Sequence, residues 1–237
     1  MLANTTDMSR RQAAILGGTG LIIMLLAVIV AFPNTLSLIV QGDPTKTVQQ
    51  ITEAGILYRI GIVGWMVVLA CDILVSLAFY VYFKKVHQSY SLLTAWFRLF
   101  YTAIFAAMLV QMLVVLLLFN GAEYLTVFTK AQQHALVLLS LRIFEIGWLF
   151  GLGFFGIHLF GLGYLALKSD EVPKILGILL IVASVGYTSD TVAYIALPSY
   201  KQYEETIKMI IAFPNAAGEL FFGFWLLFKG GKSRQSE

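Results

Sequence analysis

Eight ionisable side chains lie within or at the edge of long apolar runs of this chain. They are Arg59, Asp72, Arg98, Arg142, Glu145, His158, Asp190 and Glu219. On insertion scales, one Asp, Lys or Arg at the centre of a membrane helix costs about 2.5–3.5 kcal/mol, so such residues face the protein interior and find partners. These groups are therefore the candidates for ion binding, proton relay or structural pairing.

Two of these residues are expected to form a pair in the inner half of the membrane. Asp72 and Arg98 lie on consecutive apolar runs joined by a short loop, so their helices should be neighbours. At 1.5 Å per residue their depths differ by roughly 6 Å, which an arginine side chain can span. We predict the pair Asp72–Arg98, with His158 near it.

A second polar cluster is predicted in the outer half of the membrane. It consists of Arg59, Arg142, Glu145, Asp190 and Glu219, with Tyr187 on the face of Asp190 and Asn215 on the face of Glu219. Three acids stand against two arginines, an imbalance that indicates a protonated carboxyl group or a bound cation.

Both groups also have a structural interpretation, in which the charges only fix which helix packs on which. His158 can likewise be an interior histidine whose hydrogen bonds are satisfied. No metal site is predicted, because the single cysteine, Cys71, cannot build a zinc site alone and only one histidine lies deep enough for a haem ligand. The expected depths of His158, Glu145 and Asp190 also disagree with a shared zinc ion. We expect no cofactor.

The elements that must position these residues are membrane helices. The chain of 237 residues is 59% hydrophobic and 12% charged, with a mean hydropathy of +0.83, and a soluble fold of this size could not bury so much apolar surface. We predict an all-α, polytopic membrane helical bundle that forms a single transmembrane domain over 1–237. Each of six spans is long enough to cross a ~30 Å hydrocarbon layer: 13–35, 58–83, 92–119, 138–167, 173–197 and 208–228.

Loop residues predict the orientation and two helix starts. Nine Lys and Arg residues lie in the segments on the side of the N-terminus and four on the other side, which predicts that both termini are cytoplasmic. Asp43-Pro44 has the pattern of an N-cap, which predicts a short interfacial helix over 44–54. Thr129 and Gln132 form a capping-box pattern, so the fourth spanning helix should begin outside the membrane.

Several short motifs follow one another along nearly the whole chain, from Arg11 to Gly230. They are Tyr58-Arg59, Cys71-Asp72, Phe97-Arg98-Leu99, His158 with Gly161-Leu162-Gly163-Tyr164, Gly186-Tyr187 with Asp190, and Gly218-Glu219-Leu220. Their order and spacing resemble those of the family called domain of unknown function 4386. The resemblance implies a small multi-pass membrane protein of a mostly bacterial family, and it implies no activity and no catalytic residue.

The function that these residues favour is small-solute or ion binding and transport through the outer cluster, in the cytoplasmic membrane of the cell. Glu219 and Asp190 would respond to ions or protons, and Arg142 or Arg59 would hold an anionic group. The alternatives are an intramembrane enzyme acting on a lipid or isoprenoid through His158, and a non-catalytic membrane subunit with structural ion pairs. The expected partners are the lipid bilayer and a small solute or ion. With a net charge of +3 scattered among loops, nucleic acid is not expected, and the oligomeric state is left open.

Overall fold

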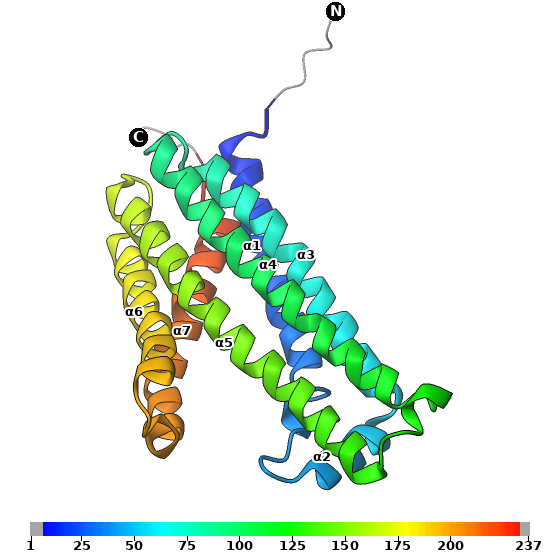
Figure 1. Ribbon diagram of the computed structural model, residues 1–237. Coiled ribbons are helices and arrows are strands. Elements are labelled where there is room, and N and C mark those ends of the chain that lie inside the picture. The colour runs from blue at the N-terminus through cyan, green and yellow to red at the C-terminus, as the bar shows by residue number, and fades with distance from the viewer. Residues whose placement is uncertain (1–6, 233–237) are drawn as a thin grey trace, which may run out of the picture. The chain divides into compact units, whose positions relative to one another are not determined.

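The computed structural model describes residues 7–232, apart from the side chains at positions 201, 205, 208 and 210–217. Over these residues the regular structure is entirely helical, which confirms the all-α class. The elements are α1 (Arg10–Ala31), η1 (Leu36–Leu38), α2 (Pro44–Ala54), α3 (Ile56–Phe83), α4 (Gln88–Leu118), η2 (Glu123–Leu125), α5 (Lys130–Lys168), α6 (Lys174–Ala196) and α7 (Tyr200–Phe228), as Figure 1 shows.

Five helices in the described part of the chain are long and apolar enough to cross a membrane. They are α1 together with η1, α3, α4, α5 and α6. In α7 the described apolar stretch is the shorter segment Gly218–Phe228. The prediction of a helical membrane bundle is thus confirmed, whereas the sixth span over 208–228 and the cytoplasmic position of both termini stay predictions.

The helices group into two compact units. Unit 1 comprises Met1–Ile22, Cys71–Tyr101 and Leu152–Glu237, and unit 2 comprises Ile23–Ala70 and Thr102–Gly151. Helices α1, α3, α4 and α5 each have one end in unit 1 and the other end in unit 2. The single transmembrane domain over 1–237 remains a prediction.

An aromatic cluster forms the core of unit 2. Trp65 on α3 lies 5.6 Å from Phe105 on α4 and 5.4 Å from Trp148 on α5, measured between ring centroids. The indole Nε1 of Trp65 donates a hydrogen bond of 3.0 Å to Thr35, so its only polar atom is satisfied inside the core. The same Thr35 hydroxyl donates to the carbonyl oxygen of Ala31 at 2.7 Å and holds the chain against the end of α1.

The two helix starts read from loop residues occur at the expected positions in unit 2. Asp43 accepts a 2.9 Å hydrogen bond from the backbone N–H of Lys46, and this bond is the main reason why the pKa of Asp43 is lowered. Thr129 and Gln132 bond to each other's backbone N–H groups at the start of α5. Helix α5 then runs for 39 residues, roughly 58 Å at 1.5 Å per residue.

In unit 1, glycines on α5 allow α6 to approach closely. A Cβ atom on Gly156 would overlap the hydroxyl of Thr188 and lie 3.0 Å from the backbone oxygen of Ser184. A Cβ atom on Gly163 would lie 2.8 Å from the backbone oxygen of Gly177. Small residues at such a contact let two membrane helices gain van der Waals energy along their backbones.

Arginines near the start of α1 tie that helix to other elements of unit 1. Arg11 donates to three carbonyl oxygens at the end of α7, those of Leu226 at 3.1 Å, Leu227 at 2.7 Å and Gly230 at 2.8 Å. Arg10 forms a 2.6 Å ion pair with Glu171 in the α5–α6 loop. Arg11 therefore brings hydrogen-bond donors and a positive charge to the carbonyl end of α7, where both are favourable.

Replacing Gly156 by valine should destabilise the protein by about 1–3 kcal/mol, because the new side chain would force α5 and α6 apart. Thermal or denaturant unfolding of the purified protein in detergent measures this loss. Ile157→Val is the matched control, because this neighbouring side chain points outward and loses only one methylene group. Equal stability of the two variants would rule out the tight α5–α6 contact.

Candidate functional site

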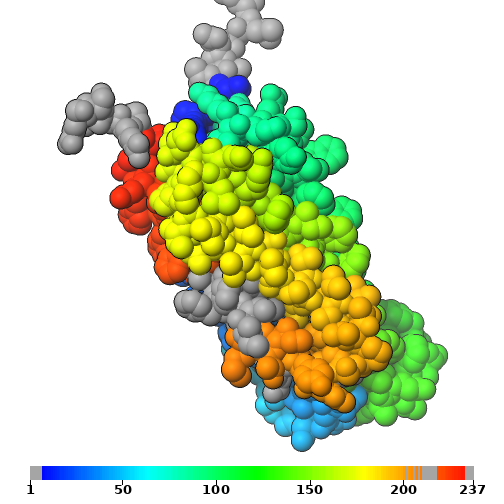
Figure 2. Space-filling view, turned by 90° about the vertical axis from the view of Figure 1, so that its left-hand side faces the viewer, coloured from blue at the N-terminus to red at the C-terminus, as the bar shows by residue number. Residues whose placement is uncertain are grey.

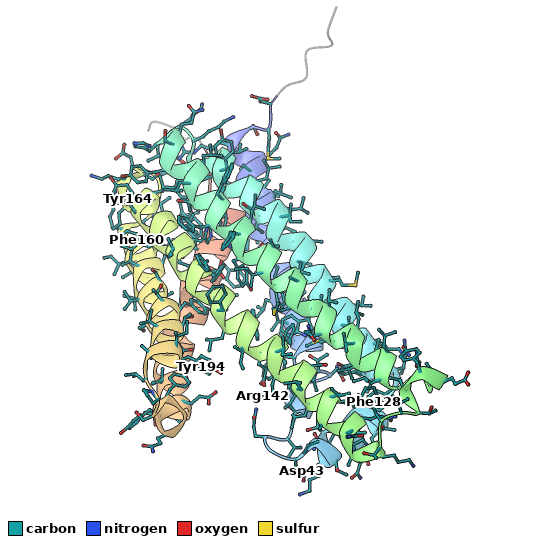
Figure 3. All side chains as sticks on the ribbon, viewed as in Figure 1. Asp43, Phe128, Arg142, Phe160, Tyr164 and Tyr194 are labelled. Atoms are coloured by element: carbon teal, nitrogen blue, oxygen red, sulfur yellow. The ribbon has the colours of Figure 1, made fainter. Side chains whose placement is uncertain are left out.

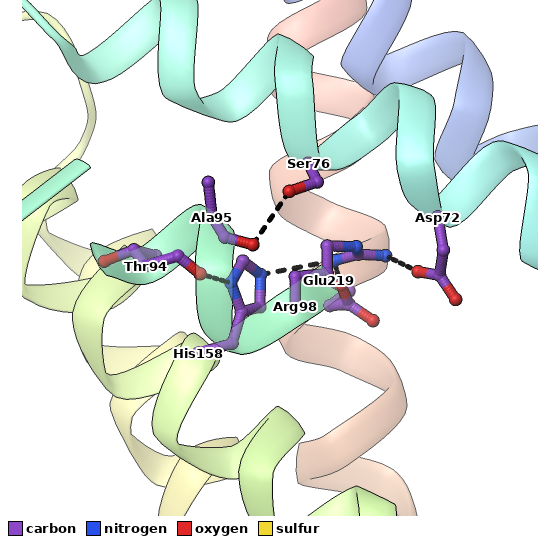
Figure 4. A network of polar contacts seen from close by, with 7 residues as sticks. All are labelled: Asp72, Ser76, Thr94, Ala95, Arg98, His158 and Glu219. Carbon is purple, nitrogen blue, oxygen red and sulfur yellow. Dashed lines mark hydrogen bonds and ion pairs between the residues drawn. The ribbon is translucent and has the colours of Figure 1, made fainter. Parts of the chain in front are cut away.

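The polar centre of unit 1 is the side chain of Arg98 on α4. Its Nη2 atom lies 2.7 Å from Oδ1 of Asp72 on α3, and its Nη1 atom lies 3.0 Å from Oε1 of Glu219 on α7 (Figure 4). The side chains of Arg98 and Asp72 are 0% exposed, and that of Glu219 is 19% exposed. One guanidinium group thus joins carboxylates from two other helices.

Hydrogen bonds along the α3–α4 hairpin explain why Asp72 and Arg98 meet. Ser76 on α3 donates to the carbonyl oxygen of Ala95 at 2.9 Å, and Ser91 on α4 donates to that of Tyr80 at 3.0 Å. The two bonds are four residues apart along each helix, which is about one helical turn, and together they fix the register of the antiparallel pair. One turn further from the loop, the same register brings Asp72 opposite Arg98.

His158 on α5 joins this network through both ring nitrogens. Its Nδ1 atom lies 2.8 Å from the carbonyl oxygen of Thr94, and its Nε2 atom lies 3.2 Å from Nη1 of Arg98. A carbonyl oxygen only accepts and a guanidinium group only donates, so the tautomer with its hydrogen on Nδ1 satisfies both contacts. In this arrangement His158 is neutral.

Aromatic rings enclose the guanidinium group. The Cζ atom of Arg98 lies 5.3 Å from the ring centroid of Phe155 and 5.7 Å from that of Phe79. The ring of Phe155 also contacts Tyr187 on α6, with 5.4 Å between centroids. Cation–π attraction therefore adds to the two ion pairs, and the rings help to shield the guanidinium group from water.

With His158 neutral, the charged groups of this site among the described side chains are two carboxylates and one guanidinium group. Both ionised acids would leave one uncompensated negative charge in an apolar interior, which is costly in the absence of a further cation. In addition, Oδ2 of Asp72 is buried and has no hydrogen-bond partner among the described residues. The arrangement can therefore take up one proton or one cation.

The described members of the predicted outer cluster belong to both units. Glu219, which we expected in that cluster, lies with Arg98 and Asp72, because its position on α7 faces the long arginine side chain of α4. In unit 2, Arg142 (labelled in Figure 3) pairs with Glu145 at 2.8 Å and donates to Gln41 at 2.8 Å. Arg59 is exposed on α3.

The remaining members of that cluster belong to unit 1. Asp190 accepts a 2.6 Å hydrogen bond from the hydroxyl of Tyr200, a residue that the sequence analysis did not single out. Tyr187 contacts Phe155, one of the two rings that enclose the guanidinium group of Arg98. The side chain of Asn215 lies outside the described residues. Phe79 and Phe155 were also missed, although Phe155 and His158 share a helix face at a spacing of three.

Metal ligands do not gather at this site. Within residues 7–232, as far as side chains are described, no group of three or more His, Cys, Asp or Glu residues could hold a metal ion. The absence of a cofactor remains a prediction.

Replacing Arg98 by methionine should destabilise the protein by about 3–5 kcal/mol, because two buried carboxylates lose their shared partner. Replacing Asp72 by leucine, Arg98 by methionine and Glu219 by leucine together should restore most of the stability, since no buried charge is left uncompensated. Denaturant unfolding in detergent measures both effects.

The control for this series is Arg142→Met, which removes a partly exposed ion pair on α5 and should cost less than about 1 kcal/mol. If Arg98→Met is no more destabilising than Arg142→Met, the Arg98 network does not hold α3, α4 and α7 together.

Comparisons with known proteins agree with this architecture. The family model described as "Domain of unknown function (DUF4386)" matches residues 16–230. An uncharacterized protein of Archaeoglobus fulgidus is 34% identical to this chain over 171 residues, which make up 72% of this chain and 84% of that protein. No solved structure matches the chain. The resemblance seen in the short motifs is confirmed, and this membrane protein belongs to the DUF4386 family.

Proposed function

We propose that this protein is a small-solute or ion carrier of the cytoplasmic membrane that takes up and releases a proton at the Arg98 site. The observation that carries the proposal is the charge balance around Arg98. Two carboxyl groups lie 2.7 Å and 3.0 Å from a single guanidinium group. One proton, carried by either of these carboxyl groups, would neutralise the site.

A proton fits this site better than a metal cation does. A metal ion near the two carboxylates would also lie close to the charged guanidinium group, which repels it. It would need several oxygen ligands as well, whereas a proton needs only one carboxylate oxygen. The buried Oδ2 of Asp72 provides an oxygen of this kind.

An anionic solute fits this site poorly. Arg98 already lies against Asp72 and Glu219, so its positive charge is more than balanced. Adding an anion would increase the negative charge in an apolar interior, at a high cost in desolvation. The solute is therefore expected to be neutral or positively charged.

Glu219 is best placed to exchange the proton with the surroundings. Its side chain is 19% exposed, whereas the side chains of Asp72 and Arg98 are 0% exposed. A protonated Glu219 would hold Arg98 more weakly, while Asp72 would still keep the arginine paired. Proton uptake would then favour conformations in which α7 is released from α4, which is the coupling that a carrier needs.

The alternatives receive less support from the same contacts. An enzyme that used His158 as a general base would need a free ring nitrogen, and both nitrogens already have partners. A purely structural subunit accounts for the ion pairs, but it has no use for the excess carboxyl group.

Infrared spectroscopy of the purified protein in detergent tests for this proton on Asp72 or Glu219. At neutral pH, the native protein should show a carboxylic acid C=O band that shifts in D2O. Either Glu219→Gln or Asp72→Asn should remove this band, because the single remaining carboxyl group would be ionised beside Arg98. The matched control is Glu171→Gln, which neutralises a half-exposed carboxyl group paired with Arg10 and should keep the band. A native spectrum without the band, or a band that survives both variants, would contradict the proposal.

Transport is tested separately in proteoliposomes that contain an entrapped pH indicator. Among a panel of neutral and cationic solutes, at least one should change the internal pH when added outside, and Glu219→Gln should abolish this change. If no member of the panel moves protons, the protein is not the proton-linked carrier proposed above.

A further inference from the structure

A second polar site lies where α6 ends and α7 begins, within unit 1. An open pocket of about 280 Å³ is lined by Tyr194, Ile195, Leu197, Pro198 and Tyr200. Figure 3 labels Tyr194 near the end of α6, and the orange surface in Figure 2 shows that this turn is exposed. On the predicted topology the turn faces the outside of the cell.

Two tyrosines line this pocket: Tyr194 is partly exposed, and Tyr200, which is 2% exposed, packs against it. Their ring centroids are 5.3 Å apart and their planes are nearly perpendicular, at 77°. The faces of aromatic rings carry partial negative charge, and they attract cations that come within about 6 Å of the centroid. The other lining residues, Ile195, Leu197 and Pro198, offer apolar contacts to a ligand.

A buried carboxylate lies at the hydroxyl group of Tyr200. Asp190 is 7% exposed, and its Oδ1 atom accepts the 2.6 Å hydrogen bond from the hydroxyl of Tyr200. Burial and this hydrogen bond raise the pKa of Tyr200, so the phenol stays protonated and keeps donating. A phenol that donates to a carboxylate has a more electron-rich ring, which strengthens its attraction for a cation.

From this geometry we propose that the α6–α7 turn binds a small organic ammonium ion. The alkyl groups would pack on Ile195, Leu197 and Pro198, and the charge would lie against the ring of Tyr194, with Tyr200 and its partner Asp190 behind that ring. The volume of about 280 Å³ lies just below the usual range for ligand pockets, which starts at about 300 Å³, and it favours ions of the size of tetramethylammonium. This proposal does not depend on the proton site at Arg98.

Titration of the purified protein with tetramethylammonium chloride, at constant ionic strength set by NaCl, tests the pocket. Isothermal calorimetry should show saturable binding, and the uncharged analogue tert-butanol should not bind. Asp190→Asn and Tyr194→Leu should each weaken the affinity by about tenfold, which corresponds to roughly 1.4 kcal/mol. Tyr200→Phe keeps the ring but loses the hydrogen bond to Asp190, and it should weaken the affinity less than Asp190→Asn and Tyr194→Leu do.

The matched control is Tyr203→Leu, which removes an exposed tyrosine of α7 that does not line the pocket and should leave the affinity unchanged. Circular dichroism and thermal unfolding show whether each variant is folded, and Tyr194→Leu carries the test if Asp190→Asn is not. Absence of saturable binding to the native protein would overturn the proposal, and so would native affinity in folded Asp190→Asn and Tyr194→Leu.

Discussion

The burial of the Arg98 guanidinium group is the constraint on which unit 1 depends. A charged group that is 0% exposed in an apolar interior must be neutralised by groups within a few ångströms. Asp72 from α3 and Glu219 from α7 meet this requirement, and His158 from α5 turns a lone pair toward the same group. One side chain thus decides which faces of four helices point inward, and the hydrophobic effect alone could not make this choice between apolar surfaces in lipid.

The sequence was sufficient to predict the helical class, the caps at Asp43 and Thr129, and the proximity of Asp72 and Arg98. These features follow from local chemistry or from helices joined by a short loop, so residue spacing contains the necessary information. The position of Glu219 does not follow in the same way. Its depth along α7 can be estimated, but the rotation of a helix far from α4 in the chain depends on packing. Tyr200 was missed for a related reason, because it follows a proline-containing turn whose course the sequence does not determine.

The Arg98 site and the pocket at the α6–α7 turn differ in their exposure to water, and this difference determines which ligands each could bind. At Arg98, the side chains of Asp72 and Arg98 are buried and that of Glu219 is partly exposed, so the proposed proton would enter and leave through Glu219. At the α6–α7 turn, the carboxylate of Asp190 is bonded to the hydroxyl of the buried Tyr200, and the partly exposed Tyr194 lines an open pocket. A dry site suits the smallest cation and an open aromatic site suits a larger one.

The order in which the ribosome makes the chain gives the α3–α4 hairpin a further role. Asp72 and Arg98 leave the ribosome more than a hundred residues before Glu219, and domains form as synthesis proceeds. The hairpin can therefore enter the bilayer as an electrically neutral pair, without waiting for the rest of the protein. Glu219 on α7 is synthesised later and then contacts Arg98. Because Arg98 is already paired with Asp72, its charge is not exposed to lipid before α7 is added.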